Sequence, residues 1–337
     1  MIKFSLAAVM LLFMLLGIDL YHYGHKPLAL PAEPVAFDLK AGSGLLALSE
    51  QMQAAHALPR GRLSLLQFRL LAKMTGQAGR IKAGFYVVDS PLTPLQLLGK
   101  LVNGDVTPRQ IRFVEGWTFV QMRTALDAYP WIDHASRDMS EAEILKALNI
   151  PHAHAEGWFF PATYDISTGS TDLSILKRAY RVMQQRLALA WRTRAAGLPY
   201  LTPEQALTMA SIIEKETGDP IERPLIAAVF LNRLRLGMRL QTDPCVIYGL
   251  GSTFDGNLRK RDLQADTPYN TYTRAGLPPT PIAMPGMAAI EAALHPANTR
   301  DLYFVAKGNG THCFTQRLVD HNRAVARYQK RLVASPK

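Results

Sequence analysis

The sequence predicts an α+β protein in three parts: an N-terminal transmembrane helix, a small α/β module, and a larger, mainly helical domain with a long loop/β region. Three observations lead to this prediction. The chain begins with an apolar run, helical and strand patterns then alternate over a short stretch, and helical patterns dominate the remainder. The expected boundaries are 1–25 for the helix and its flank, 26–34 for a linker, 35–108 for the module and 109–337 for the larger domain.

The composition excludes several classes of protein. With 337 residues, 48% hydrophobic and 19% charged, the chain is too apolar for a disordered protein and long enough for two cores. Its 2 Cys cannot form a disulfide-dense scaffold or a four-thiolate zinc site. A mean hydropathy of −0.01 excludes many membrane spans. The net charge of +11 indicates an anionic neighbour, which could be nucleic acid, a membrane surface or an acidic polymer.

The apolar run from Phe4 to Ile18 follows Lys3 and contains no charged residue. As a helix it spans roughly 22 Å, and its extension to Tyr23 reaches the roughly 30 Å of a bilayer core. The residues after the run are too bulky for a signal-peptide cleavage site, and Tyr21 and Tyr23 suit a membrane interface. We therefore expect an uncleaved signal-anchor that places the rest of the chain outside the membrane. A cleaved signal peptide and a buried helix are the alternatives.

The module follows a Pro-rich linker, which we expect to be stiff and extended. Aromatic and β-branched residues predict strands at 35–39 and 83–88. Apolar residues at helical spacing predict helices over 45–52, 64–74 and 94–101. The last of these begins with Thr93 as N-cap and Pro94 at the first helical position.

The larger domain opens with a strand at 110–116 and continues with helices. The helical patterns cover 172–196, 203–217 and 222–236. The stretch 241–285 differs, because it is rich in Gly, Pro, Thr, Asn and Tyr and has little periodicity. A loop of this length inside a compact domain indicates function.

The helix at 203–217 ends with two acidic residues that point in different directions. Glu214 and Glu216 are about 200° apart around the helix, so they cannot form a pair of facing carboxylates. Glu216 falls inside the apolar stripe beside Ile212 and Met209, and Glu214 falls at its edge. The side that we expect to face solvent carries Thr208, Ser211 and Lys215.

A carboxyl group inside a core-facing stripe is costly unless it is paired or protonated. Burial raises its pKa toward the range of a general acid. Glu216 is therefore a candidate proton donor. The alternative is a solvated carboxylate in the frayed last turn of the helix.

Nine short motifs follow one another along the chain. They are EGWFFP at 156–161, ASIIEKET at 210–217, FLNRL at 230–234, GMRLQTDP at 237–244, YNTY at 269–272, GLPP at 276–279, PG at 285–286, HP at 295–296 and LYFV at 302–305. In this order they resemble the signature of the YceG-like family, the endolytic murein transglycosylases of bacterial inner membranes. The resemblance extends to the N-terminal anchor and the module, so it covers essentially the whole chain.

The resemblance implies an enzyme of the lyase class and a fold. The module would be a LysM-like glycan-binding domain, and 109–337 a catalytic YceG-like domain. The enzyme would cleave the MurNAc-β-1,4-GlcNAc bond within peptidoglycan strands and leave 1,6-anhydroMurNAc ends, in cell wall assembly and glycan strand termination. One carboxylic acid suffices, acting first as acid and then as base. The resemblance assigns that role to Glu216 and leaves Glu214 a supporting one.

The motif positions also imply substrate-binding residues. These are Glu156, Gln241, Asp243, Tyr269, Asn270 and Tyr272. Their amides, carboxylates and ring faces suit a sugar with polar edges and one apolar face, although a capping role for Glu156 and core positions for the tyrosines are alternatives. Two positions depart from the family's pattern: Ala162 stands where the family often has Asp, and Cys245 stands where Thr is usual.

We expect no cofactor and no metal, since His152 and His154 have no evident third ligand. Cys245 and Cys313 could form a disulfide or remain two free thiols. The expected partners are peptidoglycan glycan strands, the cytoplasmic membrane and, through the family alone, peptidoglycan synthases, with no nucleic acid. The expected location is the bacterial inner membrane, single-pass, with a periplasmic body. A non-catalytic peptidoglycan-binding scaffold and a water-using muramidase remain alternative functions.

Overall fold

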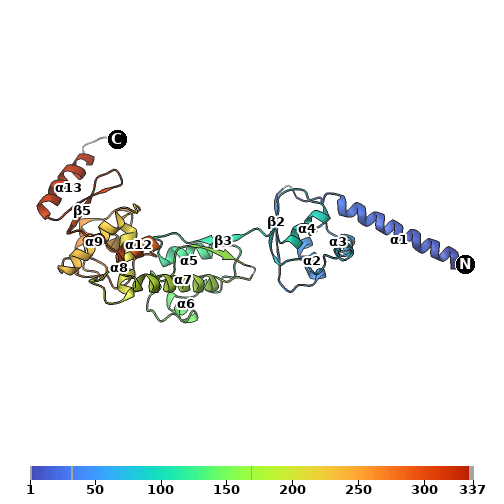
Figure 1. Cartoon of the computed structure of the whole chain (residues 1–337), viewed down its shortest axis with the longest axis horizontal. Coiled ribbons are helices and arrows are strands. Elements are labelled where there is room, and N and C mark those ends of the chain that lie inside the picture. Colours follow the sequence, from blue (N-terminus) through green and yellow to red (C-terminus); the bar gives the residue numbers. More distant parts are fainter. Residues whose placement is uncertain (1, 32, 168, 334–337) are drawn as a thin grey trace. The chain divides into compact units, whose positions relative to one another are not determined.

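The computed structural model describes the backbone of residues 2–31, 33–167 and 169–333, and it describes side chains from residue 10 to residue 328 apart from positions 32 and 168. The described residues form a mixed α+β structure of helices and two-stranded sheets, as the sequence predicts (Figure 1). They divide into two compact units. Unit 1 comprises Met1–Gln110 and Asp165–Ser170, and unit 2 comprises Ile111–Tyr164 and Thr171–Lys337.

Unit 1 contains a pair of antiparallel strands with two helices between them in the chain. Its elements are α1 (Ile2–His25), β1 (Val35–Leu39), α2 (Leu45–Ala54), α3 (Arg62–Met74), β2 (Gly84–Val88) and α4 (Pro94–Asn103). The strands pair from Val35 with Val88 to Leu39 with Gly84. Each strand and helix predicted for the module is present. Thr93 caps α4 as its sequence indicates, because its hydroxyl accepts a hydrogen bond from the backbone N–H of Gln96.

Helix α1 has two different environments along its length. Near its end Leu20 is buried in the core of unit 1, and Asp19 accepts a hydrogen bond of 2.9 Å from Gln67 of α3. From Met10 to Leu16 the side chains are apolar and exposed. The side chains of residues 1–9, which belong to the predicted anchor, lie outside the described residues. Among the described residues, no helix is long and apolar enough to cross a membrane.

Unit 2 is mainly helical and is built around α8. Its elements are α5 (Phe119–Asp127), α6 (Glu141–Ala147), α7 (Asp172–Arg192), α8 (Pro203–Glu216), α9 (Arg223–Arg235), α10 (Asp243–Leu250), η1 (Gly251–Thr253), α11 (Lys260–Gln264), α12 (Met287–Leu294), β5 (Tyr303–Ala306), β6 (His312–Thr315) and α13 (Leu318–Val333). The strands β3 (Arg109–Arg112) and β4 (Thr163–Ile166) pair with each other, and the division between the units falls within both. Helices α7, α9, α10 and α12 all pack against α8.

Packing on several sides corrects one expectation for α8. Thr208 and Ser211, predicted to face solvent, are 5% and 0% exposed. The Ser211 hydroxyl donates to the carbonyl of Thr208 at 2.7 Å and accepts from the N–H of Ile282 at 2.9 Å. The prediction was wrong because small hydroxyl side chains can be buried when the backbone supplies hydrogen-bond partners.

The segment 241–285 also differs from the expected irregular loop. It contains α10, η1 and α11. Helices of one or two turns are too short to display a periodic apolar face, and they alternate here with Gly- and Pro-rich stretches. The segment is therefore more ordered than its composition predicts.

We predict that Gly157→Ala destabilises unit 2. Gly157 has a φ of +85°, and a Cβ atom there would collide with the ring of Pro281. Strain and overpacking together should lower the free energy of unfolding by about 1–3 kcal/mol. Thermal unfolding followed by circular dichroism measures the change. Gly218→Ala is the matched control, because nothing lies within 4 Å of a Cβ there and its φ is ordinary; equal melting shifts for the two variants would contradict the prediction.

Candidate active site

A pocket of about 430 Å³ lies in unit 2 at the C-terminal end of α8. Its apolar wall includes Phe230, Leu240, Phe304 and Val305. Its polar members are Glu216, Arg233, Gln241, Thr242, Asp243, Tyr272, His312 and His321. A concave site with an apolar wall and a few convergent polar groups is the usual form of a ligand-binding pocket.

Glu216 is the last residue of α8, and its carboxyl group lies in this pocket. The helix stops there because Thr217 is extended, with φ −149° and ψ 140°. Burial raises the pKa of Glu216, and the nearby Asp243 raises it further. A hydrogen bond from the Thr242 hydroxyl to Oε1 and the positive field of His312 act in the opposite direction. The site therefore favours the protonated acid and also holds partners for the anion.

Asp243 and Tyr272 form a second polar group in the pocket. The Tyr272 hydroxyl donates to Oδ1 of Asp243 at 2.6 Å. Asp243 is the first residue of α10, where the helix dipole favours a negative charge. Gln241 precedes them with a φ of +53°, and its side-chain oxygen accepts from Nη1 of Arg233 at 3.3 Å. Three residues predicted to bind substrate therefore lie beside Glu216.

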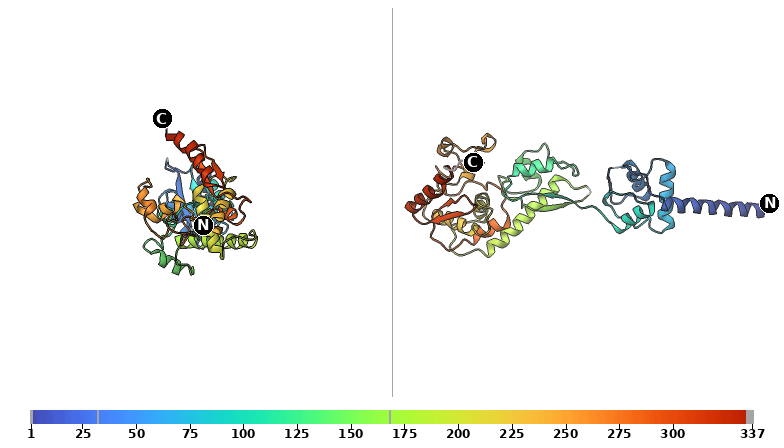
Figure 2. Two further views of the ribbon diagram at one scale, coloured as in Figure 1. Left: turned by 90° about the vertical axis from the view of Figure 1, so that its left-hand side faces the viewer. Right: turned by 90° about the horizontal axis from the view of Figure 1, so that it is seen from above.

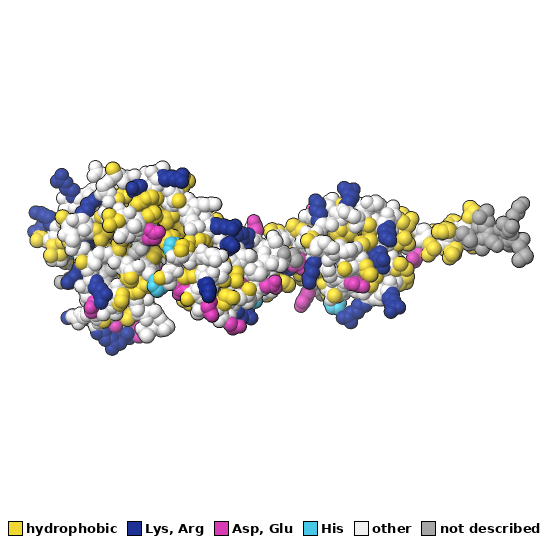
Figure 3. All heavy atoms as spheres, turned by 90° about the horizontal axis from the view of Figure 1, so that it is seen from below, with side chains coloured by type: hydrophobic (Ala, Val, Ile, Leu, Met, Phe, Trp, Pro, Cys, Tyr) yellow, Lys and Arg dark blue, Asp and Glu magenta, His cyan; other side chains and the backbone are white. Residues whose placement is uncertain are grey.

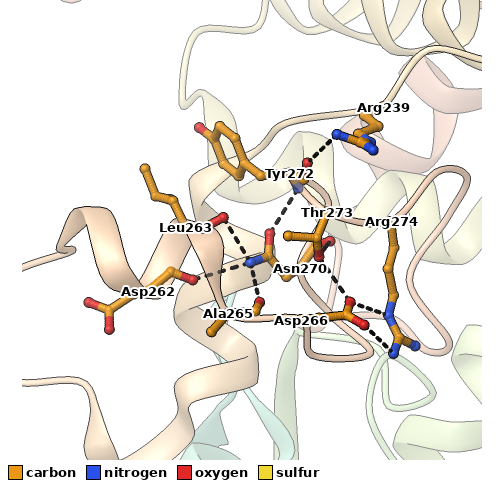
Figure 4. A network of polar contacts seen from close by, with 9 residues as sticks. All are labelled: Arg239, Asp262, Leu263, Ala265, Asp266, Asn270, Tyr272, Thr273 and Arg274. Carbon is orange, nitrogen blue, oxygen red and sulfur yellow. Dashed lines mark hydrogen bonds and ion pairs between the residues drawn. The ribbon is translucent and has the colours of Figure 1, made fainter.

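Asn270 holds the loop that carries Tyr272 (Figure 4). Its side chain is fully buried, and Nδ2 donates to three backbone carbonyls, those of Asp262, Leu263 and Ala265. Its Oδ1 accepts from the N–H of Tyr272 at 2.9 Å. All of its polar atoms are therefore used within the protein, so Asn270 shapes the loop.

The same loop fixes the position of Thr242. The Thr271 hydroxyl accepts from the N–H of Thr242 at 3.0 Å and donates to the Thr242 carbonyl at 3.3 Å. The N–H of Gln241 donates to the Thr271 carbonyl at 3.1 Å. These bonds connect the loop that Asn270 shapes to the hydroxyl that contacts Glu216.

Arg233 holds another part of the pocket wall. Its Nε donates to the carbonyl of Leu302 at 2.7 Å, and Nη1 donates to the carbonyls of Arg239 and Leu240 at 3.2 and 2.9 Å. The guanidinium also lies over the ring of Tyr303. Arg233 thus joins α9 to the segment before Gln241 and to β5.

Glu222 and His312 form a pair that sequence reasoning missed. Nδ1 of His312 lies 2.6 Å from Oε2 of Glu222, and the backbone N–H of His312 donates to Oε1 at 2.7 Å. Because a carboxylate can only accept a hydrogen bond, Nδ1 of His312 carries the proton that is donated to Glu222. Nε2 is the remaining ring nitrogen of His312, which lines the pocket. The two residues are 90 positions apart in sequence, so no local pattern could reveal the pair. The sequence could have indicated Arg233 and Thr242 as site residues, because they lie inside the motifs at 230–234 and 237–244.

Besides Asn270, two predicted binding residues, Glu156 and Tyr269, lie outside the pocket lining. Glu156 is buried at the start of α5, where its carboxylate accepts from the N–H of Phe119 at 3.1 and 3.2 Å and from the Tyr248 hydroxyl. Burial raises the pKa of Glu156 to about 7. Tyr269 shares a hydrogen bond of 2.8 Å with Thr280 and packs against Tyr248. The structure thus gives both residues partners within the protein.

Glu214 points to different surroundings from Glu216. Its Oε2 accepts from the N–H of Gly286 at 3.0 Å. Burial raises its pKa too, as it does for Glu156. A raised pKa therefore does not single out one carboxyl, whereas the pocket singles out Glu216.

Among the described residues, no group of three His, Cys, Asp or Glu side chains is arranged to hold a metal. Cys245, buried in α10, and Cys313, in β6, are both free thiols.

The family model for the YceG-like family matches residues 37–327 of the chain. The chain belongs to the YceG-like family. It is 35% identical over 278 residues to the endolytic murein transglycosylase of Bacillus subtilis, covering 77% of this chain and 76% of that protein. It is 28% identical over 327 residues to the endolytic murein transglycosylase of Streptococcus pneumoniae strain R6, covering 87% of this chain and 58% of that protein.

A YceG-like protein from Listeria monocytogenes has a crystal structure similar to this one. The TM-score is 0.53 at 29% sequence identity, and the match covers 87% of this chain and 99% of that one. The YceG-like fold therefore spans both units of this family member.

We predict that Asp243→Asn lowers the pKa of Glu216. The substitution removes a negative charge that favours the protonated carboxyl. An NMR titration of ¹³C-labelled glutamate carboxyls, with Glu216 assigned through Glu216→Gln, measures the change. Tyr272→Phe serves as the control, since it removes the hydrogen bond to Asp243 and keeps its charge. A pKa that rises or stays in place in Asp243→Asn contradicts the prediction.

Proposed function

We propose that this YceG-like chain is an endolytic peptidoglycan lytic transglycosylase, a lyase that cleaves the MurNAc-β-1,4-GlcNAc bond within glycan strands. The observation that carries the proposal is the Glu216 carboxyl, which lies in a pocket that favours its protonated form. The names of the relatives support the same activity.

The reaction needs one group that gives a proton and then takes one back. Protonated Glu216 donates to the glycosidic oxygen as the bond from that oxygen to C1 of the muramyl residue breaks. The muramyl C6 hydroxyl then attacks C1, and the Glu216 carboxylate takes its proton. Water is not consumed, and the product carries a 1,6-anhydro ring.

The surroundings of Glu216 fit both halves of this cycle. Burial and Asp243 favour the acid before bond cleavage, and the Thr242 hydroxyl stabilises the carboxylate that forms. A group that must act in both directions works best when its two forms are close in free energy. We propose that Gln241, Asp243 and Tyr272 bind the sugar beside it, and that Glu156, Tyr269 and Asn270 support the walls.

A water-using muramidase is the second candidate, and the presence of Asp243 in the pocket favours it. Hydrolases of glycosidic bonds use two carboxyl groups, one as acid and one as nucleophile or base. The products distinguish the two reactions, because hydrolysis leaves reducing ends and the lyase leaves anhydro ends. A scaffold without activity would release no fragments.

We also propose the location and the role of unit 1. The apolar start of α1 anchors the chain in the bacterial inner membrane by a single pass and leaves the body in the periplasm, with 35–108 as a LysM-like module and 109–337 as the catalytic domain. A pocket of about 390 Å³ in unit 1, lined in part by Phe85, offers the module a site for glycan. The family resemblance suggests peptidoglycan synthases as partners. The net charge of +11 suits anionic lipids and the carboxylates of stem peptides.

We predict that Glu216→Gln lowers the rate of glycan cleavage by about 10²–10⁴-fold, the range for loss of a general acid. The full-length protein in detergent is incubated with purified sacculi, and released fragments are counted and identified by mass spectrometry. Glu214→Gln is the matched control, because it changes the neighbouring carboxyl of the same helix and keeps an acceptor oxygen for Gly286. Full activity in Glu216→Gln would refute the assignment of Glu216.

We predict further that wild-type fragments carry 1,6-anhydroMurNAc ends. Mass spectrometry distinguishes them from reducing ends by the missing mass of one water. Reducing ends would establish the muramidase instead, and the absence of fragments from folded protein would favour the scaffold.

A further inference from the structure

Helix α3 carries an exposed row of large apolar side chains that no part of the proposed activity uses. Leu63, Leu66, Leu70 and Met74 are 67%, 57%, 39% and 68% exposed. At about 100° per residue they fall within a sector of about 80°. We call this set the apolar stripe of α3. Four large exposed side chains in one row differ from the scattered exposed apolar residues of an ordinary surface.

The rest of the α3 surface is divided with equal regularity. Phe68, Leu71 and Ala72 face the core of unit 1. A basic sector directly beside the apolar stripe carries Arg62, Arg69 and Lys73. An apolar face flanked by Lys and Arg is typical of a helix that lies in the interface of a membrane.

The contacts between α1 and α3 show which way the apolar stripe faces. The Tyr23 hydroxyl of α1 donates to the carbonyl of Ser64, on the core side of α3. About one turn earlier in α1, Asp19 accepts from Gln67, which lies between the core side and the apolar stripe. The partner of Tyr23 thus lies on the core side of α3, whereas the partner of Asp19, which is nearer the N-terminus of α1, lies closer to the apolar stripe. The stripe therefore faces the direction in which α1 leaves unit 1.

The orientation of α3 agrees with this direction. Figure 2 (right) shows α3 running across the end of α1 rather than along it. Figure 3 shows hydrophobic side chains, with Lys and Arg beside them, on the end of unit 1 nearest α1. The exposed apolar side chains of α1 from Met10 to Leu16 begin just beyond this end. If α1 stands upright in a bilayer, α3 lies flat at its surface.

We propose that α3 is an interfacial membrane helix whose apolar stripe inserts into the headgroup region of the bilayer that holds α1. Arg62, Arg69 and Lys73 contact anionic headgroups beside it. This inference rests on the proposed anchoring by α1. Unit 1 is thereby held against the membrane by two contacts, one across the bilayer and one along its surface.

The proposal is tested with the full-length protein in vesicles of phosphatidylethanolamine and phosphatidylglycerol. A tryptophan is introduced by Leu66→Trp or Leu70→Trp, both at exposed positions where the fold tolerates the change. Lipids with bromine in the upper part of the acyl chains quench a tryptophan that inserts among them. The emission of the wild-type protein, whose tryptophans all lie in unit 2, is subtracted.

Val106→Trp is the matched control. Val106 is 44% exposed and lies beside Gly84 in the pocket of unit 1. Within unit 1, Figure 1 shows β2, whose first residue Gly84 adjoins Val106, on the side away from α1. We expect bromolipid to quench Leu66→Trp and Leu70→Trp several-fold more strongly than Val106→Trp. The quenching should weaken in vesicles without phosphatidylglycerol, because the basic sector then loses its partner.

Flotation of the same samples separates this inference from the anchoring on which it rests. Protein that floats with vesicles but shows equal quenching at all three positions overturns the role of α3 and leaves the anchoring intact. Protein that does not float refutes the anchoring itself. A tryptophan at position 66 that is shielded from water but not quenched by bromolipid would identify a protein partner and also overturn the proposal.

Discussion

Part of the wall of the Glu216 pocket, at 240–242 and Tyr272, lies outside the helices and strands, and the backbone around it is held by hydrogen bonds from side chains. Arg233 and Asn270 donate several of these bonds. Arg233 donates to three carbonyls, including that of the pocket residue Leu240, and Asn270 donates to three carbonyls just before the loop that carries Tyr272. An unsatisfied buried carbonyl costs about 1–3 kcal/mol. These two side chains therefore determine the shape in which Thr242 and Tyr272 meet Glu216.

The sequence predicted the elements of the module and the inward direction of Glu216, because both depend on local patterns. Apolar spacing fixes which side of a helix is buried, and a Thr followed by Pro and Gln marks a helix start. The burial of Ser211 could not be predicted, since it depends on the N–H of Ile282, 71 positions away. The pairing of Glu222 with His312 could not be predicted either, because these residues are 90 positions apart in the sequence.

The predicted site residues fall into two groups, those that line the pocket and those whose polar atoms are bonded within the protein. Gln241, Asp243 and Tyr272 lie together with Glu216, whereas Glu156 and Asn270 use their polar atoms inside the protein. Motif membership cannot separate these two groups, because a residue that shapes a loop and a residue that faces a ligand occur in the same short motifs. Only the hydrogen-bond partners distinguish them. The buried Asn270, with four backbone partners, is the clearest case.

The pocket is assembled from pieces that are far apart along the chain, with Glu216, Thr242, Tyr272 and His312 on separate segments. A ribosome releases these pieces one after another, and β5, β6 and α13 come last. Until they emerge, the carboxyl of Glu216 lacks part of its enclosure and remains open to water. For a protein whose proposed target is the cell's own wall, this order of synthesis leaves the Glu216 pocket incomplete until β5, β6 and α13 have been made.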